Sequence, residues 1–80
     1  MLDSIHAFSR PITIRLNGET QTITTPVEAR NILLMEWPGE RGDKHKIASS
    51  LCLDAMEGAD PEPAWLAFME AAIEAEIFVE

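Results

Sequence analysis

Apolar and polar residues alternate in the first third of the chain. Residues 11–16 read Pro-Ile-Thr-Ile-Arg-Leu, and apolar side chains at every second position are typical of a strand with one buried face. Asn17 and Gly18 follow, a pair that favours a tight two-residue turn. The pattern predicts a β-hairpin in which Ile12 faces Ile23, with the threonines of the second strand on the outer face. Because a hairpin alone is marginally stable, we expect helices to cover its apolar face.

Start and stop signals predict three helices after the hairpin. Thr25 and Glu28 form a capping box around a proline, and Pro38 ends this first helix near residue 36. A second helix begins with Asp43 as its cap and ends near Gly58, and a third begins at an Asp-Pro pair. Apolar residues spaced by three and four are expected to face the core from these two helices: Ile47, Ala48, Leu51, Cys52 and Ala55 in the second, and Trp65, Phe68, Met69, Ala72 and Ile73 in the third.

The order of these elements indicates the fold class. Residues 77–79, Ile-Phe-Val, have the β-branched and aromatic character of a strand and can add a third strand beside the hairpin. The expected class is α+β, with an N-terminal β-hairpin packed on three α-helices and a short C-terminal third strand. Eighty residues supply one core, so we expect a single domain, which covers residues 11–80. Residues 1–10 precede the first predicted strand and are expected to form a flexible N-terminal segment.

The first predicted helix has more apolar side chains than one core can bury. On a helical wheel Val27, Leu34 and Met35 point away from the face that carries Leu33, and Leu53 of the second helix also lies off its inward face. Apolar surface of this kind marks an interaction site. We therefore expect a small noncatalytic protein-interaction module that self-associates as a homodimer.

Charge and composition exclude several classes of partner. The formal net charge is -8, and residues 51–80 carry the whole excess, with eight Asp or Glu and no Lys or Arg. This acidity disfavours nucleic acid, which binds clustered cations.

The longest apolar run covers six residues, far below the roughly 18 needed to span a membrane. A single cysteine, Cys52, cannot form an internal disulfide, and the N-terminus lacks a signal-peptide pattern, so we expect a cytoplasmic protein.

The chain resembles a known family in a set of positions that begins with the Pro-Ile-Thr-Ile strand and its glycine turn. The other matching residues are Glu28, Ala29, Leu34, Trp37, Pro38, Arg41, Gly42, His45, Ala48, Cys52, Ala55, Gly58, Ala67, Phe68, Ala71 and Ala72. From about Phe8 to Val79 the chain resembles the bacterial domain-of-unknown-function family 982. The family pattern has a glycine before the last apolar triplet, where this chain has Glu76. The resemblance implies a small mixed α and β domain with no agreed activity.

The stretch from Trp37 to Lys46 is a second candidate contact region, because Trp and Arg are enriched at binding hot spots. Trp37 has two readings, a lid over the core or a surface anchor stacked on Arg41. His45 is expected to be a capping or solvated residue near a helix start. A regulatory adaptor that binds another protein through this stretch is the alternative to self-association. The residues expected to bind a partner are Leu34, Met35, Trp37, Arg41, Lys44, His45 and Lys46.

His45, Ser49 and Cys52 are the candidates for a small enzyme or ligand-binding site. His45 and Cys52 are two helical turns apart, about 10 Å, too far for proton transfer, and Cys52 is flanked by apolar residues that predict burial. The two histidines lie in different segments without a second cysteine, so no metal set forms. Residues 39–42 match the phosphate-clamping GXXG loop of KH domains only weakly. We expect no catalytic residue, metal, cofactor, nucleic-acid partner or known small molecule.

Overall fold

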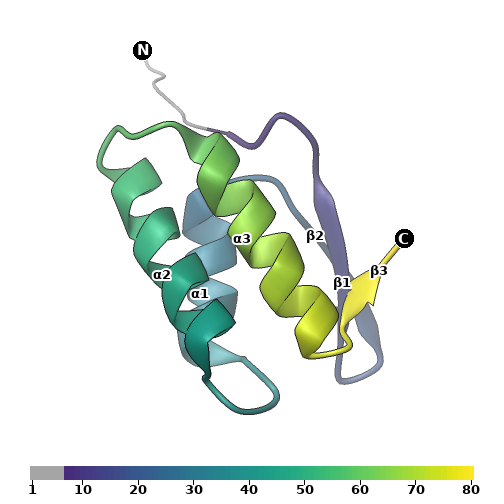
Figure 1. Cartoon of the computed structure of the whole chain (residues 1–80). Coiled ribbons are helices and arrows are strands. Elements are labelled where there is room, and N and C mark those ends of the chain that lie inside the picture. The colour runs from purple at the N-terminus through teal and green to yellow at the C-terminus, as the bar shows by residue number, and fades with distance from the viewer. Residues whose placement is uncertain (1–6) are drawn as a thin grey trace.

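The computed structural model describes residues 7–80, which form an α+β fold of one antiparallel sheet and three helices. The strand order is β2-β1-β3, so β1 lies in the middle. The three helices lie to one side of the sheet, with α1 behind α2 and α3 (Figure 1). The expected fold class is confirmed, including the third strand. The elements are β1 (Ile12–Leu16), β2 (Glu19–Ile23), α1 (Pro26–Met35), α2 (Asp43–Met56), α3 (Pro61–Glu74) and β3 (Phe78–Val79).

The hairpin has the predicted register. Ile12 pairs with Ile23, and Asn17 and Gly18 adopt φ values of 52° and 81°, which are the two positive angles that a type I′ turn requires. On the other side of β1, Ile14 pairs with Phe78 of β3. The apolar face of β1 is fully buried beneath the helices, because alternation places every second side chain on that face.

The helix starts follow the predicted capping in two of three cases. The Thr25 hydroxyl accepts a hydrogen bond from the Glu28 N–H (3.2 Å), and the Glu28 carboxylate accepts one from the Thr24 N–H (2.8 Å), one residue before the position that a standard capping box uses. Asp60 caps α3. The expectation that Asp43 caps α2 is wrong: Gly42 occupies that position without a side-chain bond, because Asp43 is already in the first helical turn, where its charge favours the helix dipole.

One core fills the space between the helices and the sheet, and Phe8 belongs to it although it precedes the first strand. Its backbone N–H donates to the Thr24 carbonyl (2.9 Å). Residues 1–6, which make up most of the expected N-terminal segment, lie outside the described residues. The inward orientation expected of Ile47 and Ile73 is wrong, since both are more than half exposed. Ala48, Cys52, Ala55 and Ala72 are buried as expected, and Ala64 and Ala71 are buried with them. The small size of these residues allows close packing of α2 and α3.

Two helices end in the same hydrogen-bonding motif with different residues at its key position. After α2, Gly58 has φ 115° and the Ala59 N–H donates to the Asp54 carbonyl (3.0 Å). After α3, Glu76 has φ 63° and the Ile77 N–H donates to the Ala72 carbonyl (3.0 Å). This Schellman arrangement requires a left-handed residue, for which glycine is favoured. The chain therefore carries a glutamate where the backbone favours glycine.

Trp65 is anchored near the start of α3. Its indole Nε1 donates to the Arg10 carbonyl (2.8 Å), and the Arg10 guanidinium lies 4.6 Å from the centre of its ring. The tryptophan is almost fully buried, so its polar atom needs this partner.

Across residues 7–80, no helix combines the length and the apolar character needed to cross a membrane.

Candidate binding site

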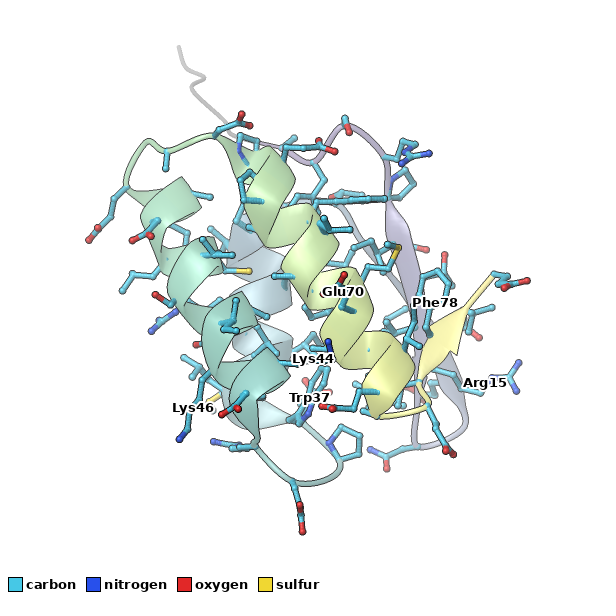
Figure 2. All side chains as sticks on the ribbon, in the orientation of Figure 1. Arg15, Trp37, Lys44, Lys46, Glu70 and Phe78 are labelled. Carbon is cyan, nitrogen blue, oxygen red and sulfur yellow. The ribbon has the colours of Figure 1, made fainter. Side chains whose placement is uncertain are left out.

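Trp37 lies just beyond the end of α1, next to Pro38 in the loop that connects α1 to α2. Its ring centre is 5.5 Å from that of His45 and 6.1 Å from that of Phe68, and the side chain is partly buried against the core. In Figure 2 it lies at the α1–α2 loop end of the helices, below Lys44 and Glu70. The indole therefore packs on the core with one part of its surface and meets solvent with the rest.

His45 is buried and packs against the Trp37 ring. Only 6% of the residue is exposed, and its Nε2 lies 2.7 Å from the Leu33 carbonyl oxygen. A carbonyl only accepts, so this nitrogen carries the proton. Leu33 is in the last turn of α1, where carbonyls lack helical partners. The expectation of a solvated residue near a helix start is wrong, because His45 is buried. Its ring does act as a cap, but for the end of the neighbouring helix α1.

The basic residues of the stretch have separate roles. Arg41 donates from Nη2 to the Leu34 carbonyl (3.0 Å), so it caps α1, whereas the cation–π contact among residues 7–80 is made by Arg10. The Lys44 Nζ lies 3.8 Å from the Glu70 Oε1, and both side chains of this ion pair are about half exposed. Lys46 is exposed on α2. The fold places His45 against Trp37, but the basic side chains of the stretch are engaged elsewhere or exposed on α2.

A depression of about 450 Å³ opens beside Trp37. Gly39, Glu40 and Gly42 line it on the loop side, and Glu74 and Glu76 line it from the end of α3. Sequence reasoning missed both residues from the end of α3, because nothing local connects them to Trp37. The one available signal was Glu76, at a position where the family resemblance implies a glycine.

The remaining candidate chemistry is enclosed. Cys52 is completely buried, and desolvation raises the pKa of its thiol to about 12, so the thiol is protonated near neutral pH and is a poor nucleophile. Its predicted burial is confirmed. The proton on His45 Nε2 is already donated to Leu33. Within residues 7–80, no group of three or more His, Cys, Asp or Glu side chains is placed to hold a metal ion.

A second set of exposed apolar residues belongs to α1 and α2, and we call these residues the α1–α2 surface. The two helices meet there, since Arg30 Nε donates to the Ser49 carbonyl (3.4 Å). Met35 is 78% exposed and Leu34 is 39% exposed. The exposed large apolar residues of this surface are Val27, Leu34 and Met35 from α1 and Leu53 and Met56 from α2. The expected surplus of apolar side chains on α1 is therefore present.

Comparison with known proteins gives one match. The sequence profile of a family described as "Protein of unknown function (DUF982)" matches residues 10–79. Neither the comparison with curated proteins nor that with solved structures found a match. The matched range contains every helix and strand of the fold. The chain belongs to the DUF982 family of proteins of unknown function.

Proposed function

We propose that this protein is a small noncatalytic interaction module that self-associates as a homodimer through the α1–α2 surface. The observation that supports the proposal is the group of five large apolar side chains that this surface leaves in solvent. Contiguous exposed apolar area is typical of protein interfaces. A two-fold dimer would bring the same surface of two copies together.

Charge favours the same part of the molecule for contact between copies. Residues 1–50, which include α1 and the first half of α2, hold six acidic and six basic residues, whereas residues 51–80 hold the whole negative excess. Two copies of an acidic chain therefore repel each other least through the α1 part of the surface, with Val27, Leu34 and Met35, whereas Leu53 and Met56 lie in the acidic range. A standard interface covers about 800 Å² on each partner, which is roughly a sixth of the 4833 Å² accessible surface of this protein. A dimer interface of standard size would therefore occupy one face of the molecule.

Sedimentation velocity tests the proposal with a matched pair of variants. We expect the unmodified chain to be dimeric at micromolar concentration and Leu34→Glu to be a folded monomer by circular dichroism, because a buried unpaired carboxylate opposes association. Leu66→Glu on α3 is the control, since Leu66 is similarly exposed (46% against 39%) and lies on another helix face. A monomeric unmodified chain, or equal effects of the two variants, would contradict the proposal.

A regulatory adaptor that contacts another protein through Trp37–Lys46 is the second candidate. Its support is the partly exposed Trp37 indole beside a depression. We propose no enzymatic role for His45, Ser49 or Cys52, since the His45 proton and the Cys52 thiol are enclosed. A cytoplasmic location fits the lone buried cysteine.

A further inference from the structure

We infer that two copies of the chain associate by antiparallel pairing of their β2 strands around a two-fold axis at Gln21, so that their sheets become one continuous sheet. The inference rests on the proposed self-association and gives it a geometry. β2 is an edge strand of the sheet (Figure 1). Together with α1 it lines a groove of about 240 Å³, which places the open edge of the sheet beside the helix that carries most of the exposed apolar residues proposed for contact.

The outer edge of β2 has unpaired backbone groups at Thr20 and Thr22. These two residues stand opposite Arg15 and Thr13 of β1. The Arg15 N–H donates to the Ile77 carbonyl (2.8 Å), so at these positions β1 directs its backbone groups toward β3. In an antiparallel ladder, the residue opposite such a position directs its own N–H and C=O groups the other way. Within residues 7–80, no backbone group pairs with this outer edge, and an unpaired edge is a template for another strand.

The neighbouring residues select one register for that strand. Thr24 cannot extend the pairing, because its N–H donates to the Glu28 carboxylate (2.8 Å) and its carbonyl already accepts a backbone hydrogen bond. Pairing of Thr20 with Thr22 of the second copy, and of Thr22 with Thr20, uses every outward N–H and C=O group of both residues. The two-fold axis then passes between the two copies of Gln21.

The side chains that this register places opposite each other are compatible. Threonine meets threonine on the outer face, a pair that stabilises sheets. Gln21 meets its own copy, and an amide that both donates and accepts is self-complementary. Glu19, the charged residue of β2, meets Ile23 of the second copy, so no like charges lie opposite each other. β2 also has no lysine, proline or bulge, the features by which edge strands avoid pairing.

The same pairing brings the exposed apolar residues of α1 toward the second copy. Opposite residues of an antiparallel pair project to the same face of a sheet, so both helix layers lie on one side of the continuous sheet. Asn31 of α1 lines the groove with Gln21. Val27, Leu34 and Met35 are three or four residues from Asn31, so they lie on the same side of α1. They supply the apolar contact that strand pairing alone lacks.

Hydrogen exchange measured by nitrogen-15 NMR of the full chain tests the pairing. At about a hundredfold above the dissociation constant of the dimer, the Thr20 and Thr22 amides should exchange about tenfold more slowly than in monomeric Leu34→Glu, because their N–H groups are bonded only in the dimer. The Gln21 amide, which is directed toward β1, should be protected in both forms. Rapid exchange of the two threonine amides in the dimer would overturn the inference, and so would their protection in the monomer.

Substitutions within β2 separate this pairing from other dimers. Thr22→Pro removes an outward N–H, which an edge strand tolerates, and should give a folded monomer by circular dichroism and sedimentation velocity. Thr22→Val keeps that N–H and should remain dimeric. Gln21→Glu places like charges opposite each other at the axis and should weaken the dimer by about fivefold. Thr20→Glu adds the same charge opposite a threonine of the second copy and should leave the dissociation constant within about twofold.

The outcomes distinguish this geometry from the proposed function itself. A monomeric unmodified chain would remove both. A dimer that Leu34→Glu dissociates and Thr22→Pro leaves intact would keep self-association and overturn pairing through β2. Equal weakening by Gln21→Glu and Thr20→Glu would overturn the axis at Gln21.

Discussion

The two tryptophans lie at opposite ends of the helical layer and have opposite environments. Trp65, in the second turn of α3, is almost fully buried, donates to the Arg10 carbonyl and carries the Arg10 guanidinium on its ring. Trp37, which contacts the second half of α3 through Phe68, is partly exposed beside a depression, and no described residue accepts a hydrogen bond from its indole. Trp65 thus has the environment of a structural residue, whereas Trp37 has that of a contact residue.

The same difference extends to the backbone around each tryptophan. At the Trp65 end, Asp60 caps α3 and a glycine ends α2. At the Trp37 end, α2 begins without a side-chain cap and Glu76 adopts a left-handed φ. Local rules that are broken together at one place indicate a functional or strained site. The difference separates an end where the local backbone rules are kept from an end where two of them are broken.

The largest expected effect is on stability when each tryptophan is removed. Trp65→Ala should lower the free energy of unfolding by about 3–5 kcal/mol, the range for truncation of a buried aromatic residue. Trp37→Ala should lower it by only about 1–2 kcal/mol, because part of its surface stays in water in both states. Urea denaturation followed by circular dichroism measures both. If the two losses were equal, Trp37 would be a core lid and the contrast would fail.

An intermediate effect is expected at the two left-handed positions, with opposite signs. Gly58→Ala should destabilise the fold by about 1–2 kcal/mol, because a Cβ atom is strained at φ 115°. Glu76→Gly should stabilise it by about 0.5–1 kcal/mol by removing the strain at φ 63°. Thermal and urea unfolding of both variants check the signs, and a loss of stability in Glu76→Gly would show that its carboxylate supports the fold.

The smallest effect is expected at the start of α1 and depends on pH. Hydrogen bonds from the Thr24 backbone N–H and hydroxyl lower the pKa of Glu28 below its usual 4.5. The charged carboxylate therefore contributes stability that is present above the unfolded pKa and is lost as pH falls through the lower folded pKa. Glu28→Gln should cost about 0.5 kcal/mol at pH 7, and the difference should close below pH 4.5. A difference that persists in acid would assign the effect to packing.

Local features of the fold could be predicted from the sequence. The register from Ile12 to Ile23 follows from a two-residue turn and from alternation, and the start of α1 follows from Thr25 and Glu28. The third strand was indicated by three residues of suitable type. Each of these inferences uses residues that are close in the chain, so no tertiary information was needed.

The candidate site depends on contacts that the sequence does not specify. His45 was read as solvated because its partner, the Leu33 carbonyl, belongs to another helix. A helical wheel gave the inward side of α2 and α3 only approximately, which is why Ile47 and Ile73 were placed inside. The depression joins Trp37 to the end of α3, and periodicity carries no information about which helix ends meet.

The central position of β1 has a consequence for synthesis of the chain. Its partner β2 follows after one tight turn, whereas its partner β3 is formed by residues 78 and 79. A ribosome releases β1, β2 and all three helices before those residues leave the exit tunnel. During that interval the edge of β1 around Ile14 has no neighbour and is open to pairing with another nascent chain. Pairing of Phe78 and Val79 with Ile14 and Thr13 then covers this edge of β1.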